Sequence, residues 1–125
     1  MQYYSLHNKS HQVGFEQALV EGLAPDGGLY FPAAITPLPP AFFDQIEQYS
    51  YPEMAYQAIR QFVGDAIPEM YLRQILAETL DFDFPLIPIN DHIYALELFH
   101  GPTLAFKDVG ARFMSRCLGY FNQHK

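Results

Sequence analysis

Apolar residues recur three or four positions apart in several parts of this chain, which is the spacing of one face of an α-helix. Such stretches occupy residues 15–22, 42–46, 55–63, 72–80 and 106–121. Gly14 suits the start of the first helix and Gly64 the end of the third, while Ser50 and Glu53 have the spacing of a capping box. The pattern therefore predicts a domain rich in helix.

Continuous apolar runs predict strands near the beginning and near the end of the chain. Residues 86–89 and 93–98 are two such runs, and the Asn90-Asp91-His92 segment between them indicates a hairpin. A further run, Leu29-Tyr30-Phe31, follows a Pro25-Asp26-Gly27-Gly28 turn in which both glycines are expected to allow positive φ. Together with the helices, these strands predict an α+β fold.

The composition fits a packed domain and excludes several kinds of partner. Half of the 125 residues are apolar and 16% are aromatic, which is enough for a hydrophobic core. The formal charge of -7, with only seven Lys and Arg residues, argues against nucleic acid or an anionic membrane as a partner. With a single cysteine, Cys117, no internal disulfide is possible, and no Cys or His grouping has the spacing of a metal site. Because the sequence shows no signal peptide and no membrane-spanning run, we expect a cytoplasmic protein.

The segment from Leu98 to Asp108 places a lysine where a reactive amine is expected. Pro102 and Thr103 mark the break before a helix, so Lys107 should lie in the first turn of that helix. The positive end of the helix dipole disfavours an ammonium group there, and burial among apolar neighbours acts in the same direction. Both effects favour the neutral amine, which is the form that attacks an aldehyde. The alternative, from spacing alone, is an ordinary solvated lysine whose charge Asp108 balances.

The helix after this lysine combines a charged stripe with a wide apolar surface. Asp108, Arg112 and Arg116 recur every four residues, in the order that favours ion pairs along a helix, and we interpret them as a solvated face. The apolar residues of this region cover more than half of the helix circumference, which predicts burial on two sides. These residues are Phe106, Val109, Gly110, Phe113, Met114, Cys117 and Phe121. A short chain does not supply that much cover, so we expect it to be a fragment of a longer protein.

Three motifs resemble those of one enzyme family. Residues 100–108 read H-G-P-T-L-A-F-K-D, which is similar to the lysine motif of threonine synthases, close to H-G-P-T-x-A-F-K-D. Residues 22–30, G-L-A-P-D-G-G-L-Y, resemble an early signature of the same family. Tyr3-Tyr4-Ser5 with Lys9-Ser10 is similar to the family's opening strand and the loop after it. The resemblance therefore covers essentially the whole chain.

The resemblance implies a fold type II lyase that depends on pyridoxal 5'-phosphate (PLP) and converts O-phospho-L-homoserine and water into L-threonine and phosphate. Lys107 would hold PLP as an aldimine and serve as the base at the reacting carbons. Phe106 and Asp108 would be further cofactor contacts, and His100 and Thr103 would contact the substrate.

By the same resemblance, residues 1–98 form an N-terminal domain, and residues 99–125 form the lysine motif with its helix. Both would normally pack against a larger α/β domain that binds PLP and is absent here. The expected partners are the small-molecule substrate and the rest of the same chain. Residues 1–125 alone are expected to be inactive.

Alternatives stay open for the protein and for single residues. The whole protein could instead be a related lyase for another phosphorylated amino alcohol, or a non-catalytic docking module. A structural hydrogen bond is the alternative for His100, and a turn or cap role is the alternative for Thr103. Packing and helix orientation are the alternatives for Phe106 and Asp108. The sequence leaves the oligomeric state open.

Overall fold

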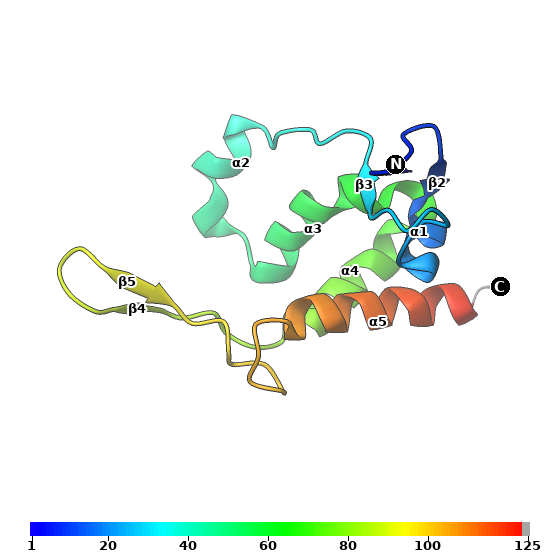
Figure 1. The fold of residues 1–125 in the computed structure, drawn as a ribbon. Helices are drawn as coiled ribbons and strands as arrows, with labels where there is room; N and C mark the ends of the chain where they lie inside the picture. Colours follow the sequence, from blue (N-terminus) through cyan, green and yellow to red (C-terminus); the bar gives the residue numbers. More distant parts are fainter. Residues whose placement is uncertain (124–125) are drawn as a thin grey trace.

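The computed structural model describes residues 1–123 of the chain, which begin with a small sheet (Figure 1). Strands β1 (Gln2–Ser5), β2 (Gln12–Gly14) and β3 (Tyr30–Pro32) are antiparallel and lie in the order β2-β1-β3. Tyr4 of β1 pairs with Gln12 on one side and with Phe31 on the other. The opening strand implied by the resemblance and the strand predicted after the glycine turn are both confirmed.

The helices begin and end close to where the apolar pattern and the cap residues place them. They are α1 (Phe15–Glu21), α2 (Pro40–Asp44), α3 (Tyr51–Val63), α4 (Glu69–Thr79) and α5 (Asp108–Gln123), with 3-10 turns η1 (Ile46–Gln48) and η2 (Gly64–Ala66). Gly14 is the N-cap of α1, and the Ser50 side chain accepts a 3.4 Å hydrogen bond from the N–H of Glu53 at the start of α3. Gly22 and Gly64 end α1 and α3 with φ of 71° and 60°, a conformation that suits glycine. The predicted helices are confirmed.

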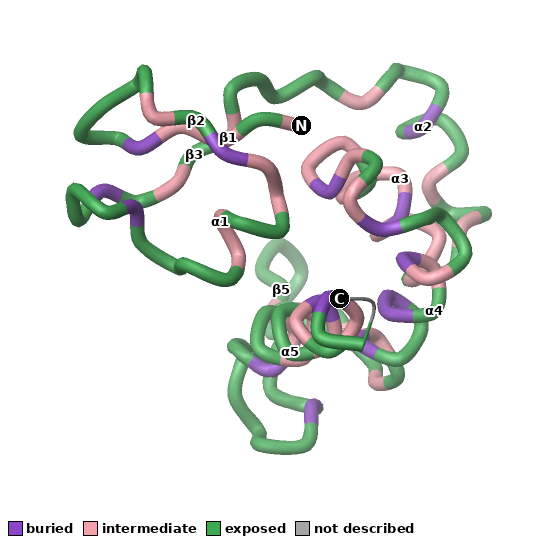
Figure 2. The backbone as a smooth tube through the Cα atoms, turned by 90° about the vertical axis from the view of Figure 1, so that its right-hand side faces the viewer, coloured by how far each residue is buried: buried purple, intermediate pink, exposed green. Residues whose placement is uncertain are grey.

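The hydrophobic core lies between α3, α4 and α5 (Figure 2). Its buried side chains are Tyr56, Val63, Ile67, Leu72, Ile75, Leu76, Cys117 and Phe121. Helix α1 joins this core through Phe15, whose ring centroid lies 6.1 Å from that of Phe121 and 6.2 Å from that of Tyr3 in β1. The core therefore connects the N-terminal sheet to α5, the helix that follows Lys107.

Strands β4 (Leu86–Pro88) and β5 (Tyr94–Leu96) form the predicted antiparallel hairpin, in which Ile87 pairs with Ala95. We call residues 86–96 the hairpin arm, because they project away from the helical body (Figure 1). Its large apolar side chains are exposed; they are Leu86, Ile87, Ile89, Ile93, Tyr94 and Leu96. None of them belongs to the core of residues 1–123.

Helix α5 is buried over only part of its apolar surface. Cys117 is fully buried and Phe121 is 5% exposed, because both lie in the core. Met114, in contrast, is 48% exposed, and Phe106 just before the helix is 66% exposed. Helices α1 and α4 cover only part of α5, so residues 1–123 do not supply the second covered side, and burial on two sides stays a prediction for a longer chain.

The strands lie in two separate antiparallel sheets and the helices form their own layer, so the α+β fold class is confirmed. Within residues 1–123, no helix is long and apolar enough to cross a membrane.

Candidate functional site

The lysine segment, residues 98–108, connects the hairpin arm to α5 (Figure 1). Two successive turns form its second half. In the first, the N–H of Leu104 donates to the carbonyl of Gly101 at 3.1 Å, and in the second the N–H of Asp108 donates to the carbonyl of Ala105 at 3.0 Å. These turns bring the chain to the first residue of α5.

Lys107 is the last residue before α5, one position earlier than predicted. Its carbonyl accepts a hydrogen bond from the N–H of Ala111 at 2.9 Å, which is the first bond of the helix, so Lys107 occupies the N-cap position. The side chain is exposed, as are Leu104 at 74% and Phe106 at 66%. Within residues 1–123, the predicted burial of the amine among these neighbours is therefore wrong, because residues 102–107 are all exposed.

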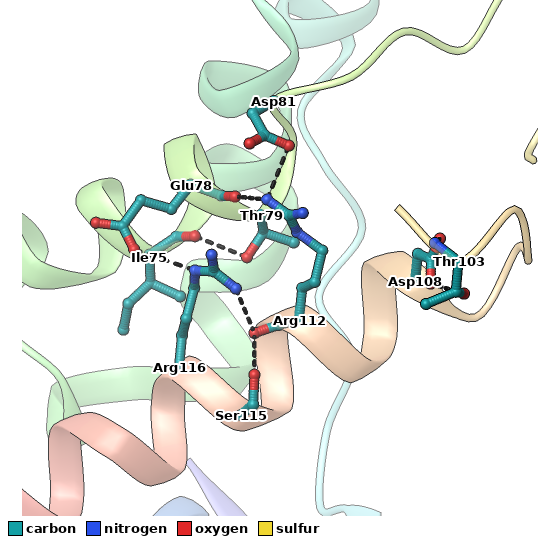
Figure 3. Close-up of polar contacts among 9 residues, drawn as sticks. All are labelled: Ile75, Glu78, Thr79, Asp81, Thr103, Asp108, Arg112, Ser115 and Arg116. Atoms are coloured by element: carbon teal, nitrogen blue, oxygen red, sulfur yellow. Dashed lines mark hydrogen bonds and ion pairs between the residues drawn. The ribbon is translucent and has the colours of Figure 1, made fainter. Parts of the chain in front are cut away.

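Asp108, in contrast, is only 5% exposed, and its carboxylate binds back to the lysine segment (Figure 3). Oδ2 accepts a 2.9 Å hydrogen bond from the N–H of Thr103, and Oδ1 accepts the Thr103 hydroxyl proton. The Thr103 hydroxyl, followed by the backbone N–H groups of Thr103 and Ala105, holds the pKa of the Asp108 carboxyl below its usual range. The carboxylate is therefore charged at neutral pH, and both of its oxygens are engaged within the segment.

Two backbone features show how tightly the segment folds over Asp108. Gly101 is buried, and a Cβ at that position would lie 2.4 Å from Oδ2 of Asp108, so only glycine fits. Leu104 has φ of 60°, in the left-handed region that costs a leucine about 1–2 kcal/mol. The segment thus holds one residue in an unfavourable conformation and another in a space too small for a side chain.

His100 is held by a different carboxylate. Its Nε2 lies 2.5 Å from Oε2 of Glu97, and its ring stacks on the ring of Phe99 with centroids 4.7 Å apart. His100 and Thr103, the two residues predicted to contact substrate, are therefore oriented by Glu97 and Asp108 respectively. The structural hydrogen bond considered for His100 is present, and Thr103, for which a turn or cap role was considered, binds Asp108 at the start of α5.

Arg112 and Arg116 join α5 to the end of α4 (Figure 3). The guanidinium of Arg112 donates to the carbonyl of Glu78 and, at 2.8 Å, to Oδ1 of Asp81. Nε of Arg116 donates to Oε2 of Glu78 at 3.1 Å. The interpretation of this stripe as a solvated face is wrong, because the two arginines bind Glu78 of α4 and Asp81 just after it, and Asp108 binds Thr103. The spacing marked these residues, but nothing local identified what they bind.

The second family motif, residues 22–30, forms a structural turn. Asp26 accepts hydrogen bonds from the Ser5 hydroxyl at 2.7 Å and from the N–H of Gly28 at 2.9 Å, and these two donors lower the pKa of its carboxyl. Gly27 has the expected positive φ, 78°. Gly28 does not, and glycine is needed there for space, because a Cβ would lie 2.2 Å from the Oγ of Ser5.

Within residues 1–123, no three His, Cys, Asp or Glu side chains are grouped so that they could hold a metal ion. His124 lies outside the described residues.

Comparison with known protein families matches residues 2–80 to the family described as threonine synthase N terminus. The match spans more than half of the chain. The chain belongs to the threonine synthase N-terminus family.

Individual threonine synthases are similar to a longer stretch of this chain than residues 2–80. The threonine synthase of Serratia marcescens is 35% identical over 118 residues, which are 94% of this chain and 28% of the relative. The crystal structure of threonine synthase from Escherichia coli has a TM-score of 0.91 and 34% identity, over 96% of this chain and 28% of that chain. The structure of PLP-bound threonine synthase from Brucella melitensis has a TM-score of 0.90 and 35% identity, over 96% and 27%.

The chain therefore spans about 28% of the length of the threonine synthases that it matches. These alignments reach beyond residue 80 because they cover more than nine-tenths of the chain, so they include the lysine segment and the beginning of α5. The fold described above is the one that threonine synthases have over this stretch.

Proposed function

We propose that this chain is the N-terminal part of a threonine synthase, a lyase that uses PLP to convert O-phospho-L-homoserine and water into L-threonine and phosphate. The family match and the likeness to threonine synthase structures support the proposal. The observation that carries its chemistry is the presence of Lys107 at the start of α5, within the lysine motif. Residues 1–125 alone should be inactive, because they span only about 28% of such an enzyme.

The geometry around Lys107 fits a lysine that holds PLP covalently. The side chain is exposed, and among residues 1–123 its Nζ has no hydrogen-bond or ion-pair partner, so the amine is available. When bound, PLP supplies an electron sink for reactions at the amino acid carbons. Nζ of Lys107 would hold the cofactor and then move protons at Cα and Cβ of the substrate. The ring of Phe106 is exposed within residues 1–123 and would pack beside the cofactor.

The two proposed substrate contacts, Thr103 and His100, differ in the hydrogen bonds that they can still make. Thr103 gives its single hydroxyl proton to Asp108, so while that bond exists it can accept a hydrogen bond but cannot donate one to a phosphate. Nε2 of His100 faces Glu97, whereas its Nδ1 has no partner among residues 1–123. We therefore assign any contact with the substrate phosphate to His100 rather than to Thr103.

The rest of the longer chain is the proposed partner of the exposed apolar surface. This surface continues from the hairpin arm along the lysine segment, where Leu98, Phe99, Leu104 and Phe106 are 40–74% exposed. A large, continuous apolar patch on the surface of a protein marks a site where another protein surface packs. We propose that residues 1–98 form the N-terminal domain and that residues 99–125 lead into a larger α/β domain, which covers the patch.

Borohydride reduction of the full-length protein, followed by peptide mapping, tests the role of Lys107. Reduction makes the link between PLP and its lysine permanent, and we expect the label on Lys107. Lys107→Ala should abolish both the label and the visible absorbance of the bound cofactor. Lys9→Ala is the matched control, because Lys9 is exposed and lies in a loop near the N-terminus, and it should retain both.

A label on another lysine, or a Lys107→Ala variant that binds PLP normally, would contradict the assignment and favour a docking module. Release of threonine from phosphohomoserine by the full-length protein decides the reaction. A protein that carries the label but acts only on another phosphorylated amino alcohol would instead be the related lyase.

A further inference from the structure

We propose that Asp108 is a positioning residue for Lys107. It would act through what we call the Asp108 clamp, in which its carboxylate accepts hydrogen bonds from the N–H and the hydroxyl of Thr103. The inference rests on the proposed function, in which Nζ of Lys107 holds the cofactor. The clamp determines the direction in which the Lys107 side chain points.

Within residues 1–123, side-chain packing does not hold the residues between the two ends of this loop. Residues 102–107 are all exposed, whereas Gly101 and Asp108 are buried. Hydrogen bonds span the loop, and those to a charged carboxylate are stronger than the neutral backbone bonds of the two turns. Because Asp108 accepts the charge-assisted bonds, the shape of the loop depends on this one side chain.

Leu104 shows that the loop is held against a local preference. Its φ of 60° is unfavourable for leucine, and its side chain is 74% exposed, so packing within residues 1–123 does not compensate for the conformation. Thr103, directly before it, is the residue that the clamp binds. When the clamp opens, Leu104 is free to return to negative φ, and the direction of Lys107 changes with it.

The other end of the clamp belongs to a firmly anchored helix. Cys117 and Phe121 fix α5 in the core, and Arg112 binds the end of α4. The clamp therefore fixes the loop that carries the lysine relative to α5. Asp108 is only 5% exposed and both of its oxygens bind Thr103, so we infer that it acts on Lys107 through the loop.

Hydrogen exchange on the full-length protein without cofactor tests the clamp directly. Thr103→Val removes the hydroxyl while keeping the shape, and Asp108→Asn replaces one acceptor oxygen with a donor. Each change should speed amide exchange at Thr103 and Leu104, whose N–H groups donate to Asp108 and Gly101, by about tenfold, the effect expected for loss of a hydrogen bond to a charged group. Thr103→Ser keeps both donors and should retain slow exchange. Asp65→Asn, an exposed carboxylate in η2, is the control and should leave exchange unchanged.

Kinetics on the loaded enzyme provide the second measurement. Thr103→Val and Asp108→Asn should each lower kcat by about tenfold or more while KM changes little, since a displaced amine impairs the reaction rather than substrate binding. The double variant should be no worse than the poorer single variant, because both changes remove one shared interaction.

Unchanged exchange in Thr103→Val and Asp108→Asn would overturn the clamp, whatever the activities are. A normal kcat in Thr103→Val beside a large loss in Asp108→Asn would also overturn it, by showing that Asp108 acts on the cofactor itself. Cofactor retention by Lys107→Ala would refute only the proposed function, because the exchange measurement needs neither cofactor nor substrate.

Discussion

Two aspartates in the two family motifs have the same local chemistry. Asp26 and Asp108 each accept hydrogen bonds from a hydroxyl and from the backbone, with Ser5 and Thr103 as the hydroxyl donors. A glycine lies against each pair, at a distance that a Cβ would not allow. An ionised carboxylate can therefore organise a loop that has little hydrophobic support, provided that donors surround it.

The pH dependence of stability should reveal the contribution of Asp26. Its pKa is lowered in the folded protein, first by the Ser5 hydroxyl and then by the N–H of Gly28. An unfolded aspartate has a pKa of about 3.9, so this contribution is fully present above about pH 4 and is lost as the pH falls through the lower folded value. Asp26→Asn should therefore destabilise the protein at neutral pH, and the difference from wild type should shrink towards pH 2.

Urea unfolding of the two proteins at about pH 7 and about pH 3 measures this difference. Asp44→Asn, at the exposed end of α2, is the control and should differ little from wild type at either pH. A difference between Asp26→Asn and wild type that stays constant on acidification would show that the loss comes from packing and not from ionisation.

Charged residues join the helices of this protein to one another. Glu53 has the position of a capping-box residue, but its carboxylate pairs with Arg73 of α4, whose guanidinium lies 3.8 Å from the ring centroid of Tyr56. Arg112 and Arg116 connect α5 to α4 in the same manner. Charged residues that share one helix face in the sequence pattern therefore pair with residues of a neighbouring helix and stabilise the contact between the two helices.

The two arginines of α5 should differ in their contribution to stability. Arg112 is 19% exposed and binds both a carboxylate and a backbone carbonyl of α4, whereas Arg116 is 29% exposed, pairs with Glu78, which is 48% exposed, and reaches a carbonyl only within α5, at 3.4 Å. We expect Arg112→Ala to lower the free energy of unfolding by about 2 kcal/mol and Arg116→Ala by about 0.5 kcal/mol. Urea unfolding of both variants measures this, and equal losses would mean that the backbone contact of Arg112 adds nothing.

The large apolar side chains of the whole molecule fall into two groups. One group forms the core between α3, α4 and α5, and a second group, which lies on the hairpin arm and the lysine segment, is exposed together with other apolar side chains such as Phe43 and Met70. Only the first group stabilises residues 1–123 by burial. The second group would contribute when the proposed larger domain covers it.

Two substitutions of similar size distinguish these groups. Leu72 is 2% exposed and Ile89 is 66% exposed. In the 125-residue chain, Leu72→Ala should lower the free energy of unfolding by about 2–5 kcal/mol, and Ile89→Ala should change it by less than about 0.5 kcal/mol. In the full-length protein, thermal unfolding should show a clear loss for Ile89→Ala as well. An Ile89→Ala variant as neutral there as in the short chain would argue that the arm stays exposed.

The local features of this fold could be predicted from the sequence because their causes lie within a few residues. Helix α3 begins at Ser50 and ends at Gly64 as its caps require, and the hairpin forms around residues 90–92. The position of Lys107 was predicted to within one residue for the same reason, since Pro102 and Thr103 interrupt the chain before α5. The role of Lys107 at that position stays a prediction.

The environment of each side chain was decided only by the tertiary structure. Arg112 finds Asp81, which is 31 positions away, and no pattern along α5 could reveal that partner. Asp108 is buried and Lys107 exposed, the reverse of what their neighbours in the sequence suggested, because the segment folds back over the carboxylate and leaves the amine outside. Spacing and caps depend on the backbone nearby, and so the sequence determined the elements. Burial and ion pairing depend on which elements meet in space, and only the assembled fold determined those.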